Sequence, residues 1–250
     1  MAYGNGEVDQ ARKVANDIMK MIWDYRDDLI KKYPALQEQL KDIEQSDRPI
    51  IIGDQGDRVI AGGPGDSTYI LNYLLESKIN VETYFPIYDP EAVATCDRAG
   101  IGGEIFLKFG GKYSSASPSV TAKGKVISLG ANVPVLYDGP SDRGTKTYIE
   151  KYAVFKVGNI SVLLTNQPYS YVDPDYFRAV GLDPEKAKII VTRSGYHFQL
   201  NFAKIGRVVT VDTPGMSSYY VDQFPWRHAR PFYPVDKIEF EPRQYTRLRV

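Results

Sequence analysis

One stretch, PIIIGDQGDRVIAGGPGDST at residues 49–68, constrains the fold more than any other part of the sequence. It opens with the apolar run Ile50–Ile52, which is typical of a strand buried on both faces, as in a parallel sheet. The run leads through Gly53 and Asp54 into a glycine-rich loop, and Tyr69 to Leu75 then follow with helical spacing. The stretch therefore predicts a strand, a loop and a helix, the order found in open α/β sheets.

The glycine-rich loop has two interpretations. Loops at the carboxyl ends of strands hold the ligands of open α/β sheets, and a glycine-rich turn before a helix offers backbone N–H groups to an anion. The candidate substrate- or anion-binding residues of this loop are Gly62, Gly63, Gly65, Asp66, Ser67 and Thr68. Such glycines often only let the backbone turn, however, and the loop matches neither the nucleotide P-loop nor the GxGxxG fingerprint.

Composition narrows the function classes. The 31 basic and 31 acidic residues cancel, which argues against nucleic acid or an anionic membrane as a partner. The single cysteine, Cys96, excludes an internal disulfide and fits a reducing compartment. No signal pattern or membrane-length apolar run is present. We expect a soluble, cytoplasmic protein.

The supply of histidines limits metal chemistry. A catalytic zinc site usually takes three protein ligands, but the chain has only His197 and His228, and neither lies in HxH or HExxH spacing. The sequence also lacks a GxSxG elbow before a helix, the motif that would indicate a serine nucleophile. We therefore predict no metal ligands in this chain.

The remaining patterns divide the chain into three segments. Residues 1–46 are a helical lead-in, with helices expected at 8–33 and 35–45. Residues 47–221 alternate strands and helices, except that strand-like runs follow one another without helices between about 103 and 165. Residues 222–250 are expected to be a tail that wraps the surface. The prediction is an α/β fold with a mostly parallel sheet flanked by helices and an inserted antiparallel β lobe at about 103–165.

Polar side chains follow three predicted strands at the point where each strand ends. Asp54 follows the first strand, Arg193 and Ser194 follow a strand at 187–192, and Asp212 follows a strand at 208–211. If these strands are parallel neighbours, their carboxyl-end loops meet at one edge of the sheet. The candidate catalytic residues are Asp54, Asp57, Arg193 and His197, and Ser194 is a further candidate substrate- or anion-binding residue. Each also has a plainer interpretation, as a turn former, a helix cap or one half of an ion pair.

Several motifs in this order resemble one family. They are IIIGDQGDRVIAGGPGDST, the helix start Asp89-Pro90-Glu91-Ala92, Gly110-Gly111-Lys112, TRSGYHFQLNF, VDTPG and the segment from Arg230 to Asp236. Together they resemble the C-terminal domain of the MlrC-like (microcystinase C) metallopeptidases, over nearly the whole chain.

The resemblance implies part of a zinc-dependent hydrolase of amide or peptide bonds. In that family the zinc ligands belong mainly to an N-terminal domain, which is expected here as a separate domain or partner subunit. This chain would line the substrate cleft, would hold no zinc and would be inactive alone. The partner is thus an MlrC-like N-terminal metal-binding domain or subunit, with a homo-oligomer also possible.

The sequence departs from the family pattern at three places. The segment Arg58–Ala61 stands where the family has Asn-Pro, Arg193 replaces a lysine, and Gln199 replaces an arginine. A guanidinium is a planar fork rather than a point charge, so the second change alters the geometry of any pairing. A non-catalytic small-molecule, anion-binding or interaction module of the same fold is therefore the alternative.

Overall fold

The computed structural model describes residues 2, 6–77, 79–114 and 117–239. The chain divides into two compact units. Tyr33–Tyr220 form an α/β unit, and the described residues of Met1–Lys32 and Val221–Val250 form the other. The three predicted segments, 1–46, 47–221 and 222–250, stay a prediction, and residues 240–250 of the expected tail lie outside the described residues.

The smaller unit contains α1 (Val8–Asp24) and the short 3-10 turn η3 (Val221–Gln223). The prediction of a helix to residue 33 is wrong about its end. Arg26 donates from Nη1 to the Trp23 carbonyl at 2.7 Å, and its guanidinium lies 4.6 Å from the centroid of the Trp23 ring. Asp27 and Asp28 come next, and negative charge is unfavourable at a helix C-terminus. Turns therefore replace the helix after Asp24.

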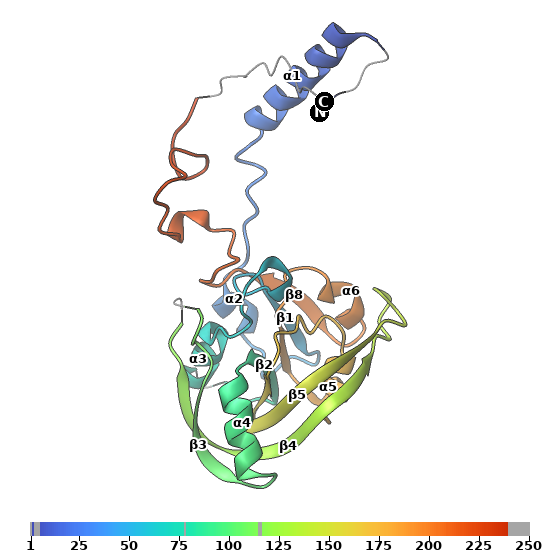
Figure 1. Cartoon of the computed structure of the whole chain (residues 1–250), viewed down its shortest axis with the longest axis vertical. Coiled ribbons are helices and arrows are strands. Elements are labelled where there is room, and N and C mark those ends of the chain that lie inside the picture. Colours follow the sequence, from blue (N-terminus) through green and yellow to red (C-terminus); the bar gives the residue numbers. More distant parts are fainter. Residues whose placement is uncertain (1, 3–5, 78, 115–116, 240–250) are drawn as a thin grey trace. The chain divides into compact units, whose positions relative to one another are not determined.

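The α/β unit is built on one eight-stranded sheet in the order β3-β4-β5-β6-β2-β7-β1-β8 (Figure 1). Five strands are parallel: β1 (Ile50–Asp54), β2 (Thr83–Tyr88), β6 (Ile160–Thr165), β7 (Ile189–Thr192) and β8 (Arg207–Val211). The antiparallel strands are β3 (Glu104–Phe109), β4 (Val120–Leu136) and β5 (Lys146–Val157). The predicted fold class is confirmed, and the antiparallel segment continues the same sheet.

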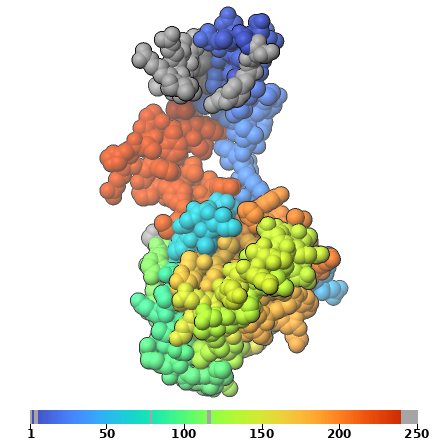
Figure 2. Space-filling view, turned by 45° about the vertical axis from the view of Figure 1, so that its right-hand side comes forward, coloured from blue at the N-terminus to red at the C-terminus, as the bar shows by residue number. Residues whose placement is uncertain are grey.

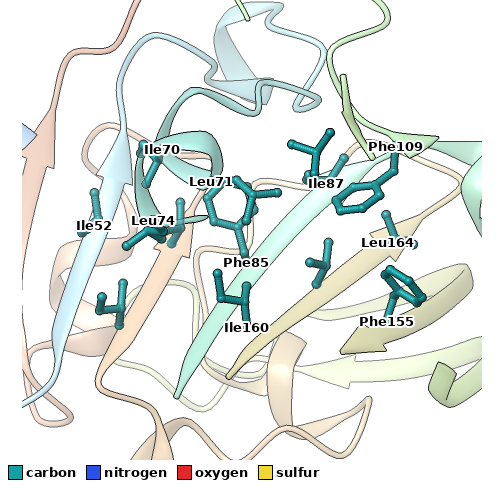
Figure 3. Packing of buried hydrophobic residues seen from close by; sticks show 14 of the residues in the cluster. Ile52, Ile70, Leu71, Leu74, Phe85, Ile87, Phe109, Phe155, Ile160 and Leu164 are labelled. Atoms are coloured by element: carbon teal, nitrogen blue, oxygen red, sulfur yellow. The ribbon is translucent and has the colours of Figure 1, made fainter. Parts of the chain in front are cut away.

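Helices cover the two faces of the sheet. The side chains of Ile50 and Ile52 belong to one core cluster and that of Ile51 to the other, because successive side chains of a strand point to opposite faces. The first cluster packs under α2 (Leu36–Leu40), α3 (Tyr69–Glu76) and α4 (Pro90–Ala99), and Figure 3 shows part of it. The second packs under α5 (Asp175–Arg178) and α6 (Phe198–Phe202). Two 3-10 turns, η1 (Val59–Ala61) and η2 (Pro184–Lys186), complete the unit.

Element lengths differ from the predictions in several places. The helix expected at 35–45 ends at Leu40, and Asp42 then adopts a left-handed φ of 60°, which does not continue a helix. The sequence after His197 also predicts a helix to Ile205, but α6 ends at Phe202. The strand-like runs of the sequence at 120–129 and 152–157 predict two short strands. In contrast, β4 and β5 extend beyond these ranges and form a long hairpin, whose yellow-green surface is visible in Figure 2.

Candidate functional site at the carboxyl edge of the sheet

Three strands bring the predicted site residues together. β1 pairs in parallel with β7 on one side and with β8 on the other. Asp54 therefore lies between the loops that carry Arg193 and Asp212, which confirms the expected convergence at one edge of the sheet. We call this edge the carboxyl rim: the loops 54–68, 193–197 and 212–220.

Arg193 is the centre of the rim and is fully buried. Its Nη1 donates to Asp54 Oδ2 at 2.9 Å and lies 3.4 Å from Asp57 Oδ2. Its Nη2 donates to the Ser67 carbonyl at 2.7 Å, and Nε and Nη2 both donate to the Pro86 carbonyl, at 3.2 and 2.9 Å. Every nitrogen of the guanidinium is thus directed at a protein oxygen. A substrate carboxylate would have to displace these acceptors.

Asp54 is fully buried beside Arg193. Its Oδ1 accepts from Thr213 Oγ1 at 2.6 Å and from the Gly56 N–H at 3.1 Å. Burial raises the pKa of Asp54 to about 6, although the Arg193 guanidinium and these hydrogen bonds act in the opposite direction. The carboxylate is well positioned to hold two loops together, but no substrate atom can reach it in this conformation.

Asp57 fixes the conformation of the glycine-rich loop from inside. Its Oδ1 accepts from the Gly65 N–H at 2.8 Å and its Oδ2 from the Ser67 N–H at 2.7 Å. The φ of Gly65 is 77°, in the left-handed region that favours glycine. The loop therefore wraps around a carboxylate of the protein itself, as a structural turn would, and binding of an external anion stays a prediction.

The other predicted donors of the loop are also engaged. The Gly62 N–H binds the Val59 carbonyl at 3.0 Å, and the Gly63 N–H binds the Arg58 carbonyl at 2.8 Å. The Thr68 N–H binds Ser117 Oγ at 3.0 Å. Anion binding by these groups stays a prediction, and it would require the loop to change conformation.

Asp66 joins the loop to the segment that follows β3. Its Oδ2 accepts from the N–H groups of Lys112 and Tyr113, at 2.6 and 2.7 Å, while its buried Oδ1 has no hydrogen-bond partner among the described residues. Burial raises the pKa of Asp66. Ser194 Oγ is likewise buried, and it has no hydrogen-bond partner in the part of the chain that the structure describes. Buried polar atoms without a hydrogen-bond partner are uncommon in proteins. At Asp66 Oδ1 and Ser194 Oγ the rim therefore has hydrogen-bonding capacity that its own described residues do not use.

Asp89 was identified from the sequence only as a helix start, but it has a second role. Its Oδ1 accepts from the Ala92 N–H at 3.0 Å and from Lys112 Nζ at 2.8 Å, and its Oδ2 accepts from the Gly110 N–H at 2.9 Å. The predicted N-cap is thus confirmed. The Gly110-Gly111-Lys112 motif was the available signal for the additional contacts.

His197 does not join the buried network. It lies exposed just before α6, with its ring centroid 6.1 Å from that of Tyr196, and its imidazole makes no hydrogen bond or ion pair within the described part of the chain. Among the four predicted catalytic residues, the structure thus brings together Asp54, Asp57 and Arg193 and leaves His197 apart, accessible from solvent.

The surface of the rim is rich in aromatic and apolar side chains. These are Ile60, Tyr196, Met216, Tyr219 and Tyr220, each at least 41% exposed. A pocket of about 260 Å³ adjoins them, lined in part by Tyr33, Tyr69, Asp212 and Tyr220. The exposed tyrosines could not be identified from the sequence, because scattered tyrosines form no motif until the fold brings them together. Aromatic surfaces of this kind bind peptides or other protein segments well.

The side chains present do not fit a zinc ion. Over the described residues, no three His, Cys, Asp or Glu side chains gather in a way that could hold a metal. Cys96 is fully buried in the core, and the paired carboxylates of Asp54 and Asp57 already face a guanidinium. No helix in the same part of the chain is long and apolar enough to cross a membrane.

The fold and the rim define an α/β domain whose loops gather at the carboxyl edge of a mostly parallel sheet. The family model for the MlrC C-terminus matches residues 52–228, and the chain belongs to that family. Microcystinase C from a Sphingomonas species is 24% identical over 192 residues, which are 76% of this chain and 36% of that protein.

A solved structure agrees with this assignment. The crystal structure of a candidate metallopeptidase from Mesorhizobium sp. BNC1 matches with a TM-score of 0.88 and 32% identity, over 95% of this chain and 47% of that one. The chain therefore spans between about a third and a half of the length of these two relatives. The resemblance found in the sequence is confirmed.

Proposed function

We propose that this chain is the C-terminal part, or a separate subunit, of an MlrC-like zinc-dependent hydrolase of amide or peptide bonds. The observation that carries the proposal is the family match combined with its partial coverage of the relatives, 36% and 47% of their lengths. The zinc ligands are assigned to an N-terminal domain or a partner chain, in keeping with the poor fit of the residues present here.

In this proposal the carboxyl rim lines the substrate cleft. Its buried ion network holds the loops at fixed positions, which a site assembled from two parts requires. The exposed tyrosines contact the substrate or the facing domain, since aromatic rings bury a large area at low entropic cost. Asp54, Asp57 and Arg193 then act as positioning residues.

His197 is the one predicted catalytic residue that a substrate can reach. Its imidazole makes no hydrogen bond or ion pair within the described residues, so both ring nitrogens are available for a contact with substrate. We assign to it the orientation or protonation of the substrate. The buried residues and His197 should therefore respond differently to substitution.

One observation favours the alternative of a non-catalytic interaction module. The N–H groups of Gly65 and Ser67 are already satisfied by Asp57, so the loop needs no ligand to be stable. An anion-binding role has less support than a role in docking, because the exposed rim is aromatic rather than rich in free donors.

The experiment combines this chain with an MlrC-like N-terminal domain supplied as a separate protein. Zinc content is measured by elemental analysis and peptide hydrolysis by chromatography, for each part alone and for the mixture. Zinc and hydrolysis that require both parts support the proposal. Stoichiometric zinc in this chain alone, or full activity of the other part alone, would overturn it.

A matched pair of variants tests His197. His197→Ala should lower hydrolysis by the mixture at least about tenfold without changing the stability of this chain. His228→Ala, which removes the other exposed imidazole from the smaller unit, serves as the control. Equal activity of the two variants would leave the rim without a catalytic role and favour the docking module.

A further inference from the structure

The open edge of the sheet carries an unusual side chain. β3 is the first strand in the sheet order, and within the described residues it pairs with β4 alone and has no strand on its other side (Figure 1). Phe106, in the middle of β3, is 76% exposed. A large aromatic side chain on an unpaired edge strand favours pairing with another chain, and native proteins usually protect such edges.

The pairing with β4 determines which backbone groups are available. The Val126 N–H donates to the Gly103 carbonyl, so in the alternating antiparallel pattern Ile105, Leu107 and Phe109 direct their N–H and C=O groups toward β4. Glu104, Phe106 and Lys108 therefore direct theirs toward the open side. Their side chains share one exposed face, while Leu107 and Phe109 point into the core.

The sequence of β3 is complementary to itself when reversed. In an antiparallel pair of two copies centred on Phe106, Phe106 lies opposite Phe106 of the other copy, and Glu104 lies opposite Lys108 at both ends. All of these positions have the outward backbone groups that such a pair needs. Lys108 has no ion-pair partner among the described residues, and Glu104 has only the exposed Lys123 at 3.7 Å.

From this geometry we infer that two copies of this chain associate through β3, about a two-fold axis at Phe106. The occupant of the edge is a second copy rather than another protein, because in that pairing Phe106 meets Phe106 and each Glu104 meets a Lys108. A C₂ contact of this kind closes on itself, and it joins the two eight-stranded sheets into one continuous sheet. The contact is small, so the association should depend strongly on protein concentration.

Charge reversal tests the inference without disturbing the core. Glu104→Lys places like charges opposite each other at both ends of the contact, and so does Lys108→Glu. Each should weaken the dimer at least about tenfold in sedimentation equilibrium, because two attractive cross-strand pairs become two repulsive ones. The double variant Glu104→Lys/Lys108→Glu should restore the dimer. An equimolar mixture of the two single variants should form a heterodimer.

Glu76→Lys and Lys146→Glu make the same charge changes at exposed positions away from β3 and should leave the dimer unchanged. A wild-type chain that stays monomeric at every concentration would overturn the inference. Association that survives both single reversals would also overturn it and would place the contact elsewhere.

Disulfide trapping tests the register independently. Hydrogen-bonded residues opposite each other in an antiparallel pair have Cα atoms about 5.5 Å apart, within disulfide range. Phe106→Cys should therefore form a cross-linked dimer on mild oxidation. Glu104→Cys alone should not, since the two copies of that position lie about 14 Å apart. A mixture of Glu104→Cys with Lys108→Cys should link, and efficient linking of Glu104→Cys to itself would contradict the register.

Discussion

Replacing Arg193 by methionine should destabilise the α/β unit severely. The substitution keeps an unbranched side chain but removes the cation that faces Asp54 and Asp57, and it leaves the carbonyls of Ser67 and Pro86 without their donor. Removing one partner of a buried ion pair costs about 3–5 kcal/mol, because the other charge stays buried without compensation. That loss is a large fraction of the total stability of a typical domain, about 5–15 kcal/mol.

The interpretation is tested by a double variant. Adding Asp54→Asn to Arg193→Met removes one of the two uncompensated negative charges. The double variant should therefore be more stable than Arg193→Met alone by at least about 1 kcal/mol. An additive or larger loss would show that the guanidinium acts mainly through the carbonyls. A cost below about 1 kcal/mol for Arg193→Met would refute the idea that Arg193 holds the loops together. It would favour instead a direct contact between Arg193 and substrate.

The assay must report on the correct unit. Both tryptophans, Trp23 and Trp226, lie in the smaller unit, so their fluorescence does not follow unfolding of the sheet. Urea unfolding followed by far-UV circular dichroism is suitable, because the strands and the helices α2–α6 all belong to the larger unit. The slope with urea should be unchanged between variants, which shows that the same surface is exposed on unfolding.

Three further predictions follow from the buried groups. Because the pKa of Asp54 is raised to about 6, the folded state binds more protons than the unfolded state between about pH 4 and 6. The stability of the wild type relative to Asp54→Asn should therefore fall by about 3 kcal/mol as the pH rises through that window, and an absent or opposite slope in urea titrations would contradict it. Asp57→Asn replaces one of the two carboxylate oxygens by an amide N–H₂ group, so either the Gly65 or the Ser67 N–H loses its acceptor. The free energy of unfolding in the same assay should fall by about 2 kcal/mol. Asp138→Asn at an exposed position should cost almost nothing. Burial raises the pKa of Cys96 to about 11, so a thiol reagent should label it only at the rate of unfolding, and fast labelling of the native chain would contradict the buried position.

The strands of the parallel part were predictable because their signal is local. Three consecutive isoleucines at 50–52 require burial on both faces, and the structure divides them between two core clusters. The ends of the helices were less predictable. The end of α1 depends on the contact of Arg26 with the Trp23 carbonyl and ring, and no apolar periodicity encodes such a contact.

The candidate site shows a different limit of sequence reasoning. The strand ends correctly placed Asp54 and Arg193 together, because parallel neighbours share a carboxyl edge. Their burial could not be predicted from that argument. A charged residue at a strand end can face solvent or lie beneath its own loop, and the sequence pattern is the same in both cases.

The glycine-rich loop shows why this difference decides function. The features that predict anion binding, glycines with left-handed φ and N–H groups directed inward, are all present in the structure. These groups bind the carboxylate of Asp57, eight residues before Gly65 in the same chain. A loop that carries its own anion is rigid without a ligand, and a rigid rim suits a surface that must meet a second domain in one arrangement. The same residues that weaken the case for an anion site in this chain therefore favour a docking surface, which the hydrolase proposal and the interaction module both require.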